Sequence, residues 1–438
     1  MKYEKLNRVK EQKKSQVRNL NDFNLVIISD NNEEKEKKIE VDKELFLWKP
    51  NGFQNMTENI IYNTDTSESF NGNEQRIPLL QQPRNRFSYY YTLLNEELQK
   101  FNNFLFRNQA KEIQLPIWQD VIFLKEDINI QDTIYFADFK NRRFQNNSKF
   151  IMINKNDMSD YVIYNIDNLD IDRQEMYKSG GFDRFWSKGS LMLPIFDVMI
   201  KDSVNKVFPS ATDRVAGFDL TFQRSVSDLD VIVDSNSLYN KYKTLFIIDK
   251  QPNRRENVTQ RWQRKLLEVD LGYGKVQTYD KSNQPFNAYN YNWTFKNRQE
   301  LNDFKTFVKK IKGKLTDFWF PTFENNMTSI NKDYESIDNY IIVNDTGLYE
   351  TYLDREIHIK INFKNRSFRA FEILSIEKDL EGEKLTLDGM LGSDFNSSDI
   401  DSINLLFKCR FNTDEFLFLH LTNDQAELSK TAFMQKFD

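Results

Sequence analysis

The sequence predicts a β-rich α+β fold made of a duplicated unit, in which a strand, a helix and a second strand are followed by a small antiparallel β-barrel or sandwich domain. Two observations carry this prediction. An aromatic segment, an apolar stripe at helical spacing and a Pro-x-aromatic segment occur in this order twice. The chain also contains 37 Phe and 19 Tyr but only 13 Gly and 9 Pro, which favours sheet-rich domains with aromatic cores.

The first copy of the unit begins with an aromatic strand over residues 87–93. Leu98, Phe101 and Phe104 follow at three-residue spacing with polar residues between them, as in a helix with one buried stripe. Residues 115–118, Leu-Pro-Ile-Trp, then indicate an extended segment, because proline cannot continue a helix.

The second copy repeats this order. Residues 291–295 form the aromatic strand, Leu301, Phe304 and Phe307 form the helical stripe, and residues 320–323, Phe-Pro-Thr-Phe, form the extended segment. The second copy differs by an insertion over residues 272–287, which predicts an extended hairpin loop. Its Tyr, Asn and Gln content suits contact with another subunit.

Both helices have candidate N-caps. Asn95 and Asn297 stand where a side chain could accept a hydrogen bond from the first turn, and Glu96, Glu97 or Glu300 would complement the helix dipole. These patterns divide the chain into four parts: a charged N-terminal arm over 1–45, a first α+β/β-barrel repeat over 46–225, a connecting segment over 226–258, and a second repeat over 259–438.

Composition excludes several classes of protein. The net charge of -5 and the pI near 5.5 argue against specific nucleic-acid binding, which needs a cationic surface. The one cysteine, Cys409, cannot form an internal disulfide, and no Cys/His cluster predicts a metal site. We expect no signal peptide and no membrane span, because no apolar run has the required length.

The candidate catalytic residues all have simpler interpretations. His358 alternates with isoleucines, which predicts an exposed strand histidine, and His420 near a strand end predicts a partly buried histidine with a satisfied partner. The pairs Asp170/Asp172 and Asp228/Asp230 could hold Ca²⁺ or act on a sugar, but a solvated strand face explains them. We therefore expect no catalytic residue, cofactor or metal.

The order of short motifs along the chain carries a resemblance. A turn at Gly72 with Glu-Gln-Arg ending at Arg76 precedes Pro-Arg at Arg84 and the first copy of the unit. The later segment 318–323, FWFPTF, and the terminal strand 403–414 with its Arg-Phe-x-x-Asp turn complete the set. In this order the sequence resembles minor tail or distal tail proteins of long-tailed, siphovirus-like bacteriophages and of gene transfer agents, over most of residues 48–435.

The resemblance implies a structural virion protein, and not an enzyme, at the distal end of a phage tail. Its copies would form a ring or collar around the tail axis and would contact the tail tube protein, the tape measure protein and the tail hub or fibre proteins. It would be made and assembled in the cytoplasm of the bacterial host. A carbohydrate-binding tail adhesin, with Tyr89, Tyr91 and Trp186 as sugar platforms, or a glycan-degrading tail enzyme remain the alternatives.

For a ring protein, arginines beside a Tyr-rich strand and aromatic residues near the Pro-x-aromatic segments are the candidates for contact between subunits. A bidentate arginine matches a carboxylate on a neighbouring chain, although Arg76 has an intramolecular alternative in Glu74. The predicted subunit-interface residues are Arg76, Arg84, Arg86, Tyr89, Tyr91, Trp118, Tyr273, Trp319 and Phe323.

Overall fold

A computed structural model describes most of the chain after residue 42, and residues Leu45–Asp438 form one compact unit. The predicted N-terminal arm lies almost entirely outside the described residues, as do Gly72, Asp228 and Asp230. The described ranges are 43–52, 56–69, 73–201, 203–208, 215–224, 239–253, 259–264, 266–280, 286–330, 332–351 and 356–435.

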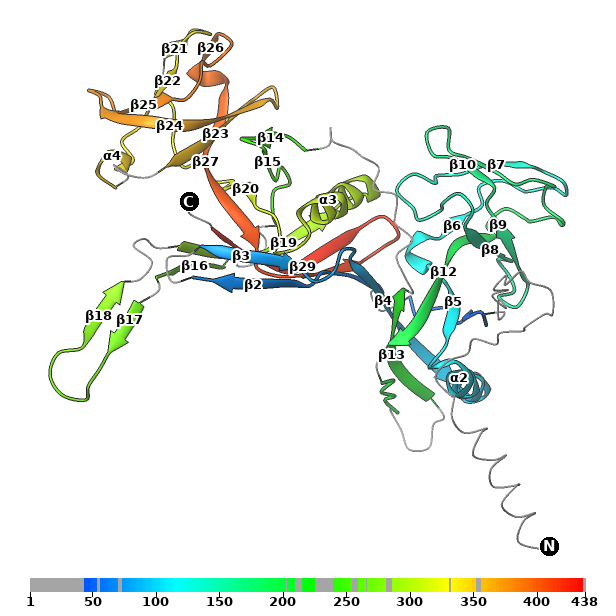
Figure 1. Ribbon diagram of the computed structural model, residues 1–438. Helices are drawn as coiled ribbons and strands as arrows, with labels where there is room; N and C mark the ends of the chain where they lie inside the picture. Colours follow the sequence, from blue (N-terminus) through cyan, green and yellow to red (C-terminus); the bar gives the residue numbers. More distant parts are fainter. Residues whose placement is uncertain are drawn as a thin grey trace, which may run out of the picture. The chain divides into compact units, whose positions relative to one another are not determined.

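The fold is dominated by one large antiparallel sheet of 18 strands (Figure 1). Its strands are β1 (Met56–Ile61), β4 (Arg84–Leu94), β5 (Glu112–Pro116), β6 (Ile122–Phe123), β8 (Lys149–Ile153), β9 (Tyr161–Asn165), β12 (Leu191–Lys201), β13 (Val215–Arg224), β16 (Thr259–Gln263), β19 (Phe286–Phe295), β20 (Phe318–Pro321), β22 (Tyr340–Val343), β23 (Ile357–Phe363), β24 (Phe368–Lys378), β25 (Glu383–Leu387), β27 (Ile400–Phe411), β28 (Glu415–His420) and β29 (Ala426–Gln435).

Smaller sheets and short helices complete the described fold. The small sheets contain β2 (Thr64–Glu68) with β3 (Glu74–Pro78), β7 (Ile134–Phe136) with β10 (Asn168–Asp170) and β11 (Glu175–Tyr177), β14 (Lys241–Tyr242) with β15 (Leu245–Phe246), β17 (Leu266–Val269) with β18 (Gln277–Asp280), and β21 (Asp333–Tyr334) with β26 (Phe395–Asn396). The helices are α2 (Asn95–Asn108), α3 (Arg298–Ile311), α4 (Leu348–Thr351), η1 (Trp118–Asp120) and η2 (Ser397–Asp399).

Strand β1 joins the two halves of the sheet, which we define as residues 84–224 and residues 286–435. On one side β1 pairs with β4 of the first half, and on the other side it pairs with β28 of the second half. The sheet therefore runs in the order β13, β4, β1, β28, β29, β19, β16. We call these seven strands the central sheet.

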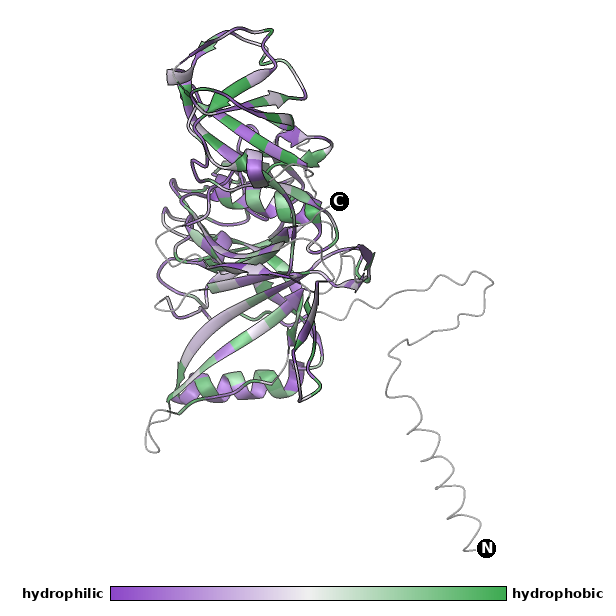
Figure 2. Ribbon diagram, turned by 90° about the vertical axis from the view of Figure 1, so that its left-hand side faces the viewer, coloured by the Kyte–Doolittle hydropathy of each residue, from purple (hydrophilic) through white to green (hydrophobic). Residues whose placement is uncertain are grey.

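Both long helices cover the same face of the central sheet. Directly paired residues in adjacent strands point to the same side, and register links Phe87, Glu58, Phe418, Leu428 and Trp293 into one row across five strands. Helix α2 packs Phe101 on this face against Phe218 of β13, with ring centroids 4.6 Å apart, and α3 packs Phe304 against Trp293 at 5.2 Å. Hydrophobic and hydrophilic residues alternate along the strands, as Figure 2 shows.

The predicted fold class is wrong. In each copy the strand after the helix does not pair with the strand before it: β5 pairs with β12, and β20 pairs with β27. The strands of each copy therefore belong to one antiparallel sheet that both halves share, and they do not close into a separate α+β unit. Local periodicity identified helix and strand residues but carried no information about their pairing partners.

The helix ends differ in how far they match the sequence. Asn297 caps α3 as predicted, because its side chain accepts a hydrogen bond from the Glu300 backbone N–H at 2.9 Å. Asn95 does not cap α2: it is the first residue of that helix with a φ of 42°, and Leu94 occupies the N-cap without a side-chain hydrogen bond. None of the helices in the described part of the chain has the length and apolar character needed to cross a membrane.

Helix α2 offers a test of this packing. Phe101 is fully buried against β13, whereas Phe106 on the same helix is 94% exposed. We predict that Phe101→Ala lowers the free energy of unfolding by about 3–5 kcal/mol, because it leaves a cavity. The matched change Phe106→Ala is expected to stay within about 0.5 kcal/mol of wild type. Urea unfolding followed by tryptophan fluorescence measures both, and equal losses would contradict this packing.

Candidate functional site

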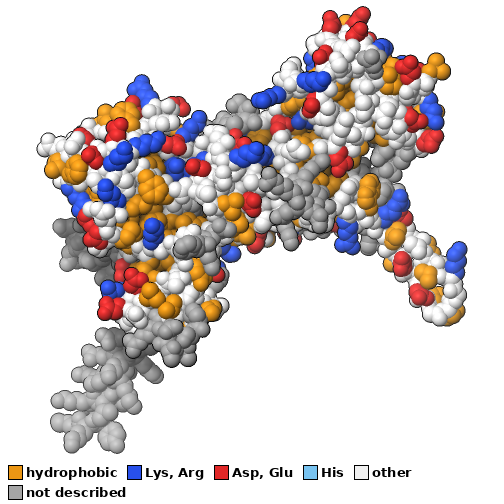
Figure 3. Space-filling model, turned by 180° about the vertical axis from the view of Figure 1, so that it is seen from behind, with side chains coloured by type: hydrophobic (Ala, Val, Ile, Leu, Met, Phe, Trp, Pro, Cys, Tyr) orange, Lys and Arg blue, Asp and Glu red, His pale blue; other side chains and the backbone are white. Residues whose placement is uncertain are grey.

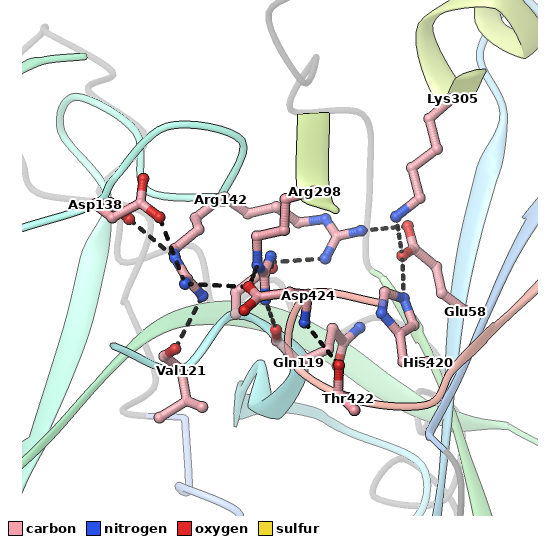
Figure 4. A network of polar contacts seen from close by, with 12 residues as sticks. Glu58, Gln119, Val121, Asp138, Arg142, Arg298, Lys305, His420, Thr422 and Asp424 are labelled. Carbon is pink, nitrogen blue, oxygen red and sulfur yellow. Dashed lines mark hydrogen bonds and ion pairs between the residues drawn. The ribbon is translucent and has the colours of Figure 1, made fainter. Parts of the chain in front are cut away.

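A cluster of buried charges lies where the two halves of the central sheet meet (Figure 4). We call it the ionic junction. Its carboxylates are Glu58 on β1 and Asp120 at the end of η1, and its cations are Arg143, Arg298 and Lys305. The side chains of both carboxylates are at most 3% exposed, so water contributes little to their stabilisation.

Glu58 is the centre of the junction. Its carboxylate accepts hydrogen bonds from Arg143, and from the Lys305 Nζ at 2.6 Å. His420 at the end of β28 brings its Nε2 within 3.3 Å of the same carboxylate. These partners come from a loop of the first half, from α3 and from β28, so one side chain ties together segments far apart in the sequence.

Asp120 links the first half directly to α3. One oxygen accepts from Arg143 at 2.8 Å, and the other accepts from Arg298 at 2.7 Å. Arg298 also donates to the Gln119 carbonyl and, at 3.3 Å, to Asp424 in the turn after β28. Arg298 and Lys305 are seven residues apart on α3, which places both on the helix face that meets the junction.

An outer layer of hydrogen bonds holds the junction in place. Arg142 donates to the Val121 carbonyl and to the Asp138 carbonyl, each at 2.9 Å, and its guanidinium lies 3.9 Å from Asp424. The buried Tyr89 hydroxyl donates to the Gln119 side chain at 2.6 Å. The polar groups that flank Asp120 thus have partners within the protein, as buried polar groups generally do.

The surroundings fix the charge of each group. Burial alone would raise the pKa of Glu58, but Arg143, Lys305 and His420 together hold it well below its ordinary value. Burial opposes ionisation of Asp120 in the same way, yet Arg143 and Arg298 lower its pKa to about 2. Burial lowers the pKa of Lys305 to about 8 despite Glu58, and it also lowers the pKa of His420.

This arrangement suits a structural connection better than proton transfer. A carboxylate whose pKa is far below neutrality is not protonated at pH 7, so neither Glu58 nor Asp120 is prepared to act as a general acid. The oxygens of both carboxylates are occupied by cations of the same chain. The junction therefore joins the halves through charge pairs where the neighbouring rows use apolar contacts.

A second cluster fastens the β2–β3 hairpin to the second half. Arg410 on β27 makes a bidentate pair with Glu74, with both N···O distances 2.8 Å. Arg76 pairs with the same Glu74 at 2.8 Å and with Asp317 at 2.7 Å. The intramolecular alternative for Arg76 is thus the arrangement found, and Glu74, whose side chain is 1% exposed, is its partner.

The other predicted interface residues fall into two groups. Tyr89, Tyr91, Trp118 and Trp319 lie in the hydrophobic cores of this chain. The remaining residues reach the surface to different extents: Arg84 and Tyr273 are exposed, and Arg86 and Phe323 are partly buried. Contact of these four with another subunit stays a prediction.

The two histidines differ from each other in outcome. His420 is buried and has Glu58 as its partner, in line with the sequence. The prediction for His358 is wrong, because it is buried between Tyr242 and Trp319, with the Tyr242 hydroxyl 3.2 Å from its Nδ1. The β14–β15 hairpin covers that face of β23, and this hairpin lies in the segment predicted as a connector.

The ionic junction itself was missed by sequence reasoning, although two signals were present. Glu58 alternates with Ile60 and so belongs to the same strand face as a core residue. Arg298 and Lys305 fall at helical spacing on the apolar stripe of α3. Asp120 and Arg143 carried no such signal, because they lie in irregular segments positioned by tertiary contacts.

Comparisons with models of protein families and with curated proteins find no match for this sequence. The resemblance to phage tail proteins therefore stays a prediction. Within the described residues, no group of three or more His, Cys, Asp or Glu side chains is arranged to hold a metal ion.

Glu58 provides a test of the junction. We predict that Glu58→Gln lowers the free energy of unfolding by about 3–5 kcal/mol, because it leaves Lys305 and Arg143 buried without their counter-charge. The matched control is Glu377→Gln, since Glu377 pairs with Lys384 at 3.5 Å on the surface and such a pair contributes at most about 1 kcal/mol. Equal unfolding midpoints for the two variants would contradict the role of the junction.

The same groups predict the pH dependence of stability. Glu58 and Asp120 have folded pKa values below their ordinary values of 4.5 and 3.8, so their contribution is present above about pH 4.5 and is lost as pH falls. The lowered pKa of His420 acts in the same direction below its ordinary 6.5, because folding favours the neutral ring. We expect the urea midpoint to fall on acidification, and to fall less below pH 4.5 in Glu58→Gln than in wild type. Parallel curves would exclude Glu58 as a source.

Proposed function

We propose that this chain is a structural virion protein at the distal end of a bacteriophage tail, where several copies form a ring or collar around the tail axis. The observation that supports this proposal best is the two-sided character of the central sheet. Helices α2 and α3 cover one face, and the other face carries mostly polar side chains. A sheet of this kind suits the wall of a water-filled channel, because one face is already packed and the other can meet water.

The polar face is consistent along the central sheet. Its hydroxyl and amide side chains alternate with the buried aromatic residues of the same strands, and Ser88 and Thr221 share a hydrogen bond at 2.8 Å across β4 and β13. The residues of this kind are Thr57, Asn59, Ser88, Thr92, Thr221, Asn290, Asn292 and Thr294.

Charge on this face is mixed. Register places Arg84 and Arg86 on the polar face together with Asp219, Glu415 and Glu427. The sequence suggests an acidic channel from the net charge of -5, but this face alone carries both signs. Weak and mixed charge would still let nucleic acid pass, because tight phosphate binding requires a strongly cationic surface.

The alternatives have less support. Tyr89, Tyr91 and Trp186 are each at most 1% exposed, so none of the three can act as a sugar platform. Asp170, one of the candidate acids, accepts from the backbone N–H groups of Asp172 and Arg173 and pairs with the Arg173 side chain, which is the role of a turn residue.

In the proposed role the partners are further copies of this chain, the tail tube protein, the tape measure protein, and the hub or fibre proteins. The protein would be assembled in the host cytoplasm and would then be located at the tail tip of the virion.

Solution mass tests the proposal. The purified 52.5 kDa chain is expected to form a closed oligomer, seen by light scattering as an integer multiple of that mass and by negative-stain imaging as a ring with a central opening. A chain that keeps the mass of one copy at all concentrations, or an oligomer without an opening, would contradict the ring.

A further inference from the structure

The β17–β18 hairpin projects from the β16 end of the central sheet (Figure 1). In the described part of the chain β17 and β18 pair only with each other. Every described residue from 266 to 280 is at least partly exposed, including Leu271 at 67% and Tyr273 at 81%. Figure 3 shows apolar side chains along this hairpin.

The two faces of the hairpin differ. Register pairs Leu267 with Tyr279 and Val269 with Gln277, so these four side chains share one mostly apolar face. We call it the apolar hairpin face. The opposite face carries Leu266, Glu268, Thr278 and Asp280, with Arg264 paired to Asp280 at 2.5 Å.

Such a hairpin requires a partner. A two-stranded hairpin alone is at best marginally stable in water, and contiguous exposed apolar side chains mark contact sites. The next question is which surface covers the apolar hairpin face.

A matching surface lies at the opposite end of the central sheet. There β13 forms a bridge from Gly217 to Val207, with N···O distances of 2.8 and 2.9 Å, and this short segment leaves Val207 69% and Phe208 55% exposed. The two apolar surfaces thus lie at β16 and β13, the two ends of one sheet, and cannot be the same patch.

Charge also favours this match. Residues 266–280 contain three carboxylates, Glu268, Asp270 and Asp280, and one lysine, so their net charge is 1 - 3 = -2. Residues 201–208 contain two lysines and one aspartate, so their net charge is 2 - 1 = +1. Surfaces of opposite sign approach each other favourably and disfavour self-contact of either one.

We propose that the apolar hairpin face of one copy packs on Val207 and Phe208 of the next copy. The contact is heterologous, because it joins two different ends of the same sheet, and repeated contacts of this kind close into a ring when the rotation between copies permits. This inference rests on the proposed ring and names the surfaces that form it.

Adjacent leucines on opposite faces give the first test. Leu267→Asp puts a charge on the apolar hairpin face and should weaken association about tenfold or more, whereas Leu266→Asp on the other face should leave the oligomer intact. Light scattering on the full chain measures both. Rings that survive in Leu267→Asp, or that dissociate equally in Leu266→Asp, would overturn the hairpin contact without affecting the proposed ring.

Cross-linking gives the second test, because the one native cysteine, Cys409, is buried. Chains with Leu267→Cys and chains with Phe208→Cys are mixed and oxidised. A disulfide between copies is expected in the mixture and not in either variant alone. Self-linking of Leu267→Cys would indicate a symmetric pair of hairpins and would overturn the inference. Cross-links in an oligomer without a central opening would support the contact and contradict the ring, and a wild-type chain that stays single would contradict both.

Discussion

The fold depends on the buried carboxylate of Glu58. In the row of side chains that crosses the central sheet, its neighbours on either side are Phe87 and Phe418, so a charge occupies a position that the pattern assigns to an apolar residue. Burial of that charge would be costly by itself. Lys305 and Arg143 offset the cost, and in doing so they fix α3 and a loop of the first half against the same strand.

The ionic junction also explains why the two halves form one unit. An apolar contact between two sheets tolerates sliding and repacking, because dispersion is not directional. The pairs of Asp120 with Arg143 and Arg298 have fixed donors and acceptors, so only one relative placement satisfies them. Arg410 and Glu74 impose the same restriction on the β2–β3 hairpin.

Sequence patterns predicted local structure better than pairing. The stripe of Leu301, Phe304 and Phe307 and the cap at Asn297 describe α3 correctly, because periodicity and capping depend on residues close in sequence. The separate α+β unit was wrong, because the partners of β5 and β20 are the distant strands β12 and β27. His358 was misassigned for the same reason: its exposure depends on the β14–β15 hairpin, which no local pattern places there.

The position of β1 has a consequence for how the chain is made. This strand is among the first described segments to leave the ribosome, yet β28, one of its two partners, lies near the other end of the chain: Thr57 pairs with Leu419. Until the last strands are synthesised, the β28-facing edge of β1 stays without its strand, and Glu58 lacks both Lys305 and His420. Folding of this region must therefore wait for translation to finish, and ribosome-bound chains stalled before β28 are the species most prone to pair with other open strands.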